Sequence, residues 1–161
     1  MTKAKSVMTP SPCCCTSTDS IADVARLMRD NDCGAVPVVD DGRIVGIVTD
    51  RDLAVRALAN GRDGATQVSE VMTNSPRCCS PEDDLRKVEK IMTDNQIRRI
   101  PVVDANGSCI GIIAQADLAR AAADGQQVSE REIAIVVEAI SEPARRAHER
   151  NGGGSTMGQH S

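Results

Sequence analysis

A threonine and an aspartate, Thr49 and Asp52, stand three residues apart where a Val/Ile-rich run gives way to helix-forming sequence. Side chains with this spacing at the start of a helix face the same side. The carboxylate can accept hydrogen bonds from both hydroxyls of a ribose, the threonine hydroxyl can bond the ribose or a phosphate, and the free N–H groups of a helix start favour a phosphate nearby. The alternative is that both residues only cap the helix.

The sequence around this pair occurs twice. Val7-Met8-Thr9 returns as Val71-Met72-Thr73, at an offset of about 64 residues. The match continues through Pro37-Val38-Val39-Asp40 with Pro101-Val102-Val103-Asp104, and through Asp52-Leu53-Ala54 with Asp117-Leu118-Ala119 after one extra residue near Gly107. Two copies indicate a pseudo-symmetric pair and not a long repeat array.

Each copy predicts the same elements. A short Cys/Thr segment precedes a helix, with Thr16 to Asp19 expected at its start in the first copy and Ser80 as its N-cap in the second. Strands are predicted over 35–39 and 44–49, and over 99–103 and 109–114, each pair joined by a Gly-containing turn and buried on both faces. A second helix begins near Asp50 or Gln115. The fold class is therefore α/β (α+β), with two β-α-β-β-α units packed on each other, because ~60 residues bury too little apolar surface alone.

This pattern divides the chain into five parts. We expect repeat one over 7–60, a linker over 61–70 and repeat two over 71–124. Ser129-Glu130-Arg131-Glu132 has the form of a capping box and precedes apolar residues at helical spacing, which predicts an amphipathic C-terminal helix over 129–147. The Gly/Ser-rich residues 151–161 are expected to be a disordered tail.

Residues 7 to 122 resemble a tandem pair of cystathionine-β-synthase (CBS) domains, as found in small stand-alone bacterial proteins. The run from Gly46 to Asp52, which includes Thr49, Asp50 and Arg51, is similar to the family's ribose-binding motif. The resemblance implies a disc with two clefts for an adenosine-containing ligand (AMP, ADP, ATP or S-adenosylmethionine). It also implies a non-enzymatic regulatory role that needs no cofactor, a homodimer, and an unknown downstream protein partner.

The two copies differ at the expected ligand groups. Asp117 is retained, but Ala114 replaces the threonine and cannot hydrogen-bond a ligand. We therefore predict unequal clefts, with the Asp52 cleft the better ribose site. Arg98 and Arg99 of the second copy have no charged counterpart in the first. Arginine suits phosphate, so they are candidates to receive the phosphates of the Asp52-bound ligand. The alternative is a solvated edge or a salt bridge to another subunit.

Two further positions are candidates for the adenine pockets. Val36 and Ile100 each precede the proline of a predicted strand. Plain core packing is the alternative for both residues.

Adjacent cysteines raise a metal or redox alternative. Cys14 and Cys15 align with Cys78 and Cys79, and thiolates bind Zn²⁺ well. Neighbouring residues on a strand point to opposite faces and rarely share one ion, so buried small side chains are the favoured interpretation. Cys33 and Cys109 are expected to be core fillers. The alternative function is a ligand-free interaction module with a thiol redox or metal site.

Composition excludes several other classes. The chain has no Phe, Trp or Tyr and a formal net charge of −4, which disfavours nucleic acid and anionic membranes as partners. No apolar run is long enough for a membrane span, so a cytoplasmic location is expected. The two histidines, His148 and His160, lie near the C-terminus, and no catalytic motif stands out.

Overall fold

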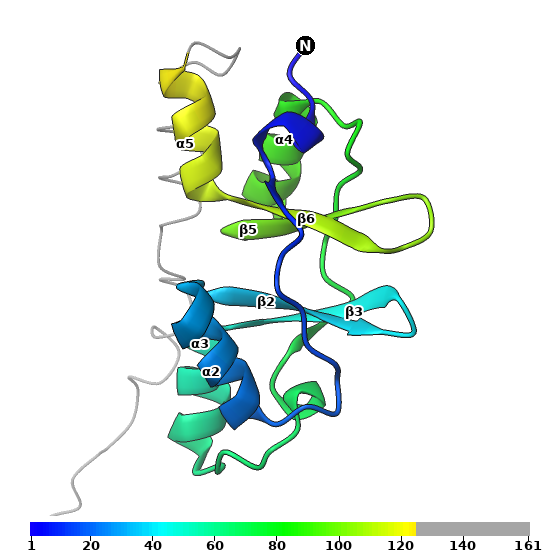
Figure 1. Ribbon diagram of the computed structural model, residues 1–161. Coiled ribbons are helices and arrows are strands. Elements are labelled where there is room, and N and C mark those ends of the chain that lie inside the picture. Colours follow the sequence, from blue (N-terminus) through cyan, green and yellow to red (C-terminus); the bar gives the residue numbers. More distant parts are fainter. Residues whose placement is uncertain (125–161) are drawn as a thin grey trace, which may run out of the picture.

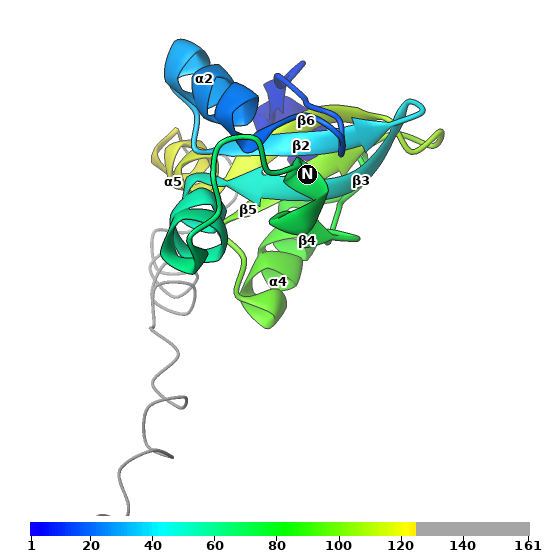
Figure 2. The ribbon, with the colours of Figure 1, turned by 90° about the horizontal axis from the view of Figure 1, so that it is seen from below.

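Two three-stranded sheets lie next to each other in the computed structural model, with helices above and below them (Figure 1). Residues 1–124 are described. One sheet has the strand order β1-β6-β5 and the other β2-β3-β4, and Figure 2 shows the second from below. All pairings within the sheets are antiparallel. The mixed α+β class predicted from the sequence is confirmed.

The elements follow one another in the same order in both repeats. The first half contains α1 (Ala4–Val7), β1 (Thr9–Pro10), α2 (Ile21–Asn31), β2 (Ala35–Asp40), β3 (Arg43–Thr49), α3 (Asp50–Asp52), the π-helical turn η1 (Leu53–Ala57) and the 3-10 turn η2 (Leu58–Asn60). The second contains the 3-10 turn η3 (Val68–Glu70), β4 (Thr73–Asn74), α4 (Leu85–Asn95), β5 (Arg99–Val103), β6 (Cys109–Ala114) and α5 (Gln115–Ala123).

The first strand of each repeat belongs to the sheet of the other repeat. Thr9 in β1 pairs with Ile112 in β6, and Thr73 in β4 pairs with Ile47 in β3. The N-terminal trace in Figure 1 accordingly starts beside α4 and then crosses to the repeat-one sheet. The buried side chain of Ala4 packs in the core of repeat two. Residues 61–70, predicted as a linker, end in η3, whose Val68 is fully buried in the core of repeat one.

The tips of the two β-hairpins also join the repeats. The Ile44 N–H donates to the Gly107 carbonyl at 3.1 Å, and the Ser108 hydroxyl donates to the Gly42 carbonyl at 3.1 Å. Gly107 has φ +83°, a backbone conformation that favours glycine. A Cβ at this position would lie 3.3 Å from the Cγ of Arg43. The repeats are thus connected at exchanged strands and again at their turns.

The first helix of each repeat starts later than predicted. The N-caps are Ser20 and Asp84, so the prediction of Ser80 and of residues 16–19 was wrong. The reason is a turn before each helix, in which the Asp19 carboxylate accepts from the Thr16 N–H and that of Asp83 from the Ser80 N–H. These hydrogen bonds use the carboxylates to close the turn, and the helix begins after it.

The second helix of repeat one contains a one-residue insertion. Leu53 and Ala54 match Leu118 and Ala119, whereas the buried Ala57 matches the buried Ala121, so Val55 has no counterpart. The helix accommodates it as a π-helical turn, in which the Leu58 N–H reaches the Leu53 carbonyl five residues back. Single π-turns are the usual result of such an insertion. Val55 is left half exposed while Ala57 keeps its place in the core.

Two aliphatic cores hold the repeats together internally. Four successive residues of β2, from 35 to 38, are buried, while β3 is buried only in part. Of these two strands, only β2 is therefore buried on both faces, as predicted.

The predicted 129–147 helix and 151–161 tail lie outside the described residues. Within residues 1–124, no helix has the length and apolarity that a membrane crossing requires.

Replacing Leu85 tests the core of repeat two. Its side chain is 2% exposed, so Leu85→Ala is expected to lower the free energy of unfolding by about 2–5 kcal/mol, from lost burial and a residual cavity. Leu58 is 75% exposed and provides the matched control, for which a change within about 0.5 kcal/mol is expected. Urea unfolding of both variants measures the difference. Equal losses in the two variants would contradict this core assignment.

Candidate functional site

The start of α3 brings Thr49 and Asp52 together. The Thr49 hydroxyl accepts from the Asp52 N–H at 3.1 Å, and the Asp52 carboxylate accepts from the Thr49 N–H at 2.9 Å through Oδ2. The capping alternative therefore describes this structure. The cap also holds the carboxylate in a fixed orientation, with Oδ1 still available to a ligand apart from a 3.6 Å approach of the Arg56 Nε.

Repeat two builds the corresponding position differently. Oδ2 of Asp117 accepts from the Ala114 N–H at 2.7 Å, while Oδ1 bonds directly to the Arg120 guanidinium. The Asp117 side chain is 7% exposed, compared with 13% for Asp52. Both carboxylates are anchored by backbone, but that of Asp117 already has a charged partner on its other oxygen.

The insertion in η1 accounts for this difference. Arg56 and Arg120 occupy equivalent positions, but Val55 places Arg56 four residues after Asp52, whereas Arg120 follows Asp117 by three. The Arg56 Nη1 donates to the carbonyls of Val71 and Met72 at 3.4 and 3.2 Å, and its Nε stays 3.6 Å from the Asp52 Oδ1. The asymmetry thus arises in the helix as well as in the exchange of threonine for Ala114.

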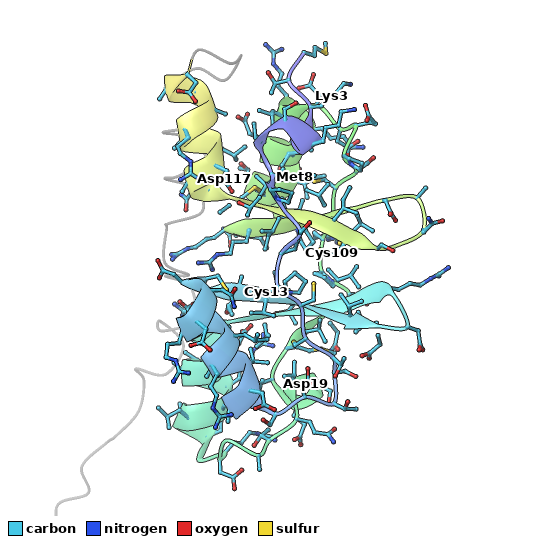
Figure 3. The ribbon with its side chains drawn as sticks, in the orientation of Figure 1. Lys3, Met8, Cys13, Asp19, Cys109 and Asp117 are labelled. Carbon is cyan, nitrogen blue, oxygen red and sulfur yellow. The ribbon has the colours of Figure 1, made fainter. Side chains whose placement is uncertain are left out.

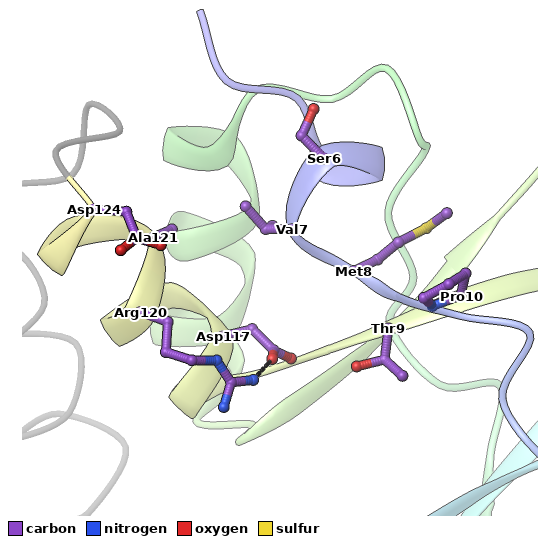
Figure 4. Close-up of a pocket in the computed structure, with 9 residues that line it drawn as sticks. All are labelled: Ser6, Val7, Met8, Thr9, Pro10, Asp117, Arg120, Ala121 and Asp124. Carbon is purple, nitrogen blue, oxygen red and sulfur yellow. Dashed lines mark hydrogen bonds and ion pairs between the residues drawn. The ribbon is translucent and has the colours of Figure 1, made fainter.

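A cavity of about 360 Å³ opens beside Asp117 (Figure 4). One wall is α5, and the other is the N-terminal segment that repeat one contributes by strand exchange. Thr9 supplies a hydroxyl there, which the sequence reasoning missed. The repeated Val-Met-Thr sequence could have pointed to Thr9, but only the pairing of β1 with β6 brings this residue next to Asp117. The lining residues are Ser6, Val7, Met8, Thr9, Pro10, Asp117, Arg120, Ala121 and Asp124.

Arg99 reaches from repeat two toward repeat one. A Cβ placed on Gly34 would lie 2.8 Å from the Arg99 Nη2 and 2.9 Å from the Asp50 Oδ2, so these two groups flank the same point. The absence of a side chain at Gly34 leaves room for both. Arg98 and Arg51 are exposed to solvent. The structure thus brings Arg99, but not Arg98, next to a residue of the Thr49–Asp52 motif.

Val36 and Ile100 are fully buried, one in each core. Their side chains pack as the core alternative predicts, and neither residue is exposed to a ligand in this conformation. The candidate site therefore rests on polar groups at the helix starts and not on these two side chains.

The cysteines fall into two classes. Cys15 and Cys79 are buried, and burial raises the pKa of each thiol to about 12. Cys14 is exposed, and a hydrogen bond from the Cys109 thiol lowers its pKa to about 7 despite partial burial. Within residues 1–124, no three His, Cys, Asp or Glu side chains gather closely enough to hold a metal ion. Cys14, Cys15, Cys78 and Cys79 therefore do not form a four-thiolate site.

The family model of the CBS domain matches residues 4–58 and 68–124. The chain belongs to the CBS domain family. It is 41% identical over 119 residues to the CBS domain-containing protein YhcV of Bacillus subtilis, covering 74% of this chain and 84% of that protein. It is 31% identical over 145 residues to hypoxic response protein 1 of Mycobacterium tuberculosis, covering 89% and 96%.

Solved CBS structures show the same fold. The crystal structure of Hypoxic Response Protein I with two coordinated zinc ions superposes with a TM-score of 0.67 at 30% identity, over 74% of this chain and 98% of that one. CBSX2 in complex with AMP gives 0.68 at 26% identity, over 79% and 100%. The CBS domain pair of protein MJ0100 in complex with 5′-methylthioadenosine and S-adenosyl-L-methionine gives 0.71 at 27% identity, over 78% and 98%.

The thiol of Cys14 should be unusually reactive near neutral pH. The thiolate is the reactive form, so its alkylation by iodoacetamide is expected to rise with pH and to reach half its maximal rate near pH 7. Mass mapping of the modified peptide measures this rate. Cys15 in the same peptide, with a pKa of about 12, serves as the internal control and should stay unmodified in the folded protein. A half-maximal rate near pH 9 would contradict the hydrogen bond from Cys109.

Proposed function

We propose that this CBS pair is a non-enzymatic regulatory module that binds an adenosine-containing nucleotide between its repeats. The single observation that carries the proposal is the Asp52 carboxylate, which Thr49 orients at the start of α3 and which keeps one oxygen available. AMP in the CBSX2 structure and S-adenosyl-L-methionine in the MJ0100 structure support this ligand class.

The Asp52 carboxylate suits a ribose. A carboxylate whose orientation is set by a backbone hydrogen bond loses little further freedom when it accepts from a ligand hydroxyl. Charge-assisted hydrogen bonds of this kind contribute about 1.5–3 kcal/mol each. The Thr49 hydroxyl accepts from the Asp52 N–H and retains its own proton to donate.

The phosphate would lie near Arg99. Its guanidinium approaches Gly34 and Asp50 from the other repeat, and phosphate is a better partner for guanidinium than solvent is. A ligand held by Asp52 and Arg99 would therefore bridge the two repeats. Binding energy of this kind would stabilise one arrangement of the pair, which a downstream protein could recognise.

The cavity at Asp117 is the second and weaker site of the proposal. A ribose there must displace the Arg120 guanidinium, whose side chain is 71% exposed, from the Asp117 carboxylate. Thr9 would supply the hydroxyl that Ala114 lacks. Both sites would hold adenine against aliphatic side chains and backbone, because the chain has no aromatic residue. The homodimer, the downstream partner and the cytoplasmic location stay predictions.

Replacing each aspartate separates the two sites. Asp52→Asn removes the charge from the ribose acceptor and is expected to weaken AMP binding by about 10- to 100-fold, as loss of charge-assisted hydrogen bonds implies. Asp117→Asn is the matched control and should leave the tighter binding step unchanged. Isothermal titration calorimetry with AMP, ATP and S-adenosylmethionine measures both variants. No binding of any of them to the wild type at millimolar concentration would overturn the proposed function.

The length of η1 should control the affinity of the Asp52 site. Deletion of Val55 is expected to restore the spacing found in repeat two, to bring the Arg56 guanidinium onto Asp52, and to weaken AMP binding about tenfold, or ~1.4 kcal/mol. Val55→Ala keeps the inserted residue and is the matched control, with unchanged affinity. Calorimetry and circular dichroism of both variants test this. Unchanged affinity in a folded deletion variant would contradict the role given to the insertion.

A further inference from the structure

The segment that crosses between the repeats carries Cys13, which lies close to Cys33 in the loop between α2 and β2. Cys13 lies between β1, which completes the sheet of repeat two, and Cys15, which bridges to Val38 in the sheet of repeat one. Figure 3 shows Cys13 on this crossing segment at the level between the two sheets. Cys33 lies in the short loop between α2 and β2.

The two thiols face each other. The Sγ atoms of Cys13 and Cys33 are 3.7 Å apart, although the residues are 20 positions apart in sequence. Both side chains are half-buried and pack against the core of repeat one. Cys33 is also held in place, because its N–H donates to the Met28 carbonyl at 3.0 Å after the left-handed residue Asp32. A small rotation of the side chains would bring the sulfurs to bonding distance.

We propose that Cys13 and Cys33 form a reversible disulfide by exchange with a low-molecular-weight disulfide. The Cys13 thiolate attacks one sulfur of that disulfide, forms a mixed disulfide and releases the first small thiolate. The Cys33 thiolate then attacks the Cys13 sulfur and expels the second. Two S–H bonds are lost and one S–S bond forms in the protein, while the external disulfide is reduced to two thiols that take up the two protons.

The order of the two attacks follows from burial. Burial and the neighbouring Cys13 raise the pKa of the Cys33 thiol to about 11, so its thiolate is scarce near neutral pH. Cys33 is therefore assigned the second step, in which it attacks the Cys13 sulfur of the mixed disulfide at short range. Cys33 pairs with Cys13 and not with the more acidic Cys14, because the Cys13 Sγ is the sulfur that lies 3.7 Å from its own.

The disulfide would connect the crossing segment to the loop that carries Gly34. A Cβ on that glycine would lie within 3 Å of both Arg99 and Asp50, so the bond would fix the backbone beside these two charged groups. This site depends only on the thiol geometry and not on nucleotide binding, so each proposal can fail without the other.

Oxidation of the folded, full-length protein with oxidised glutathione tests the proposal. We expect the seven free thiols to fall by two, with a mass loss of two hydrogen atoms and a tryptic cross-link between residues 6–26 and 30–43. Dithiothreitol should reverse the change. The cross-link should disappear in Cys13→Ser and in Cys33→Ser and persist in Cys14→Ser, the matched control on the adjacent residue.

Three outcomes would overturn the inference. Seven free thiols after oxidation, survival of the cross-link in Cys13→Ser, or a cross-link of residues 6–26 to 100–120 instead of 30–43 each exclude the pair. Circular dichroism establishes that the variants are folded, and Cys33→Ala replaces Cys33→Ser if the serine variant unfolds.

Discussion

Neither repeat can complete its sheet from its own sequence. Each unit is short and has no Phe, Trp or Tyr for its core, and a unit of this size buries too little surface to be stable alone. The exchange of β1 and β4 solves this, because each repeat supplies the third strand and several core side chains of the other. The position of Thr9 beside Asp117 and the route of the Cys13 segment both follow from that exchange.

The central strands and helices could be predicted from the sequence because their signals are local. β5 and β6 have the predicted bounds, and α2 and α4 are present where a helix was expected, although each starts later. The exchange of strands could not be predicted in this way. β1 and β4 have two residues each, with no alternation to reveal them, and their partners lie far away in sequence.

The candidate site was predicted in its residues more fully than in its geometry. Thr49, Asp52 and Asp117 stand at helix starts as expected, whereas the preference for Asp52 as the better ribose site stays a prediction. From the sequence, the difference between the two sites depended on the replacement of threonine by Ala114. The position of Arg56 depends on a π-helical turn, and residue propensities do not distinguish such a turn from a regular helix.

Strand exchange also determines when each sheet can fold, because each needs a strand from the other repeat. Thr9 is synthesised about a hundred residues before its sheet partner, Ile112 in β6. The repeat-one sheet likewise waits for Thr73. Until then the apolar residues of the N-terminal segment have no core to enter, and exposed apolar surface promotes aggregation. The single buried residue in α1 is an alanine, Ala4, and Lys3 and Lys5 flank it. The segment that waits for its partner strand therefore exposes little apolar surface in α1 while it is unpaired.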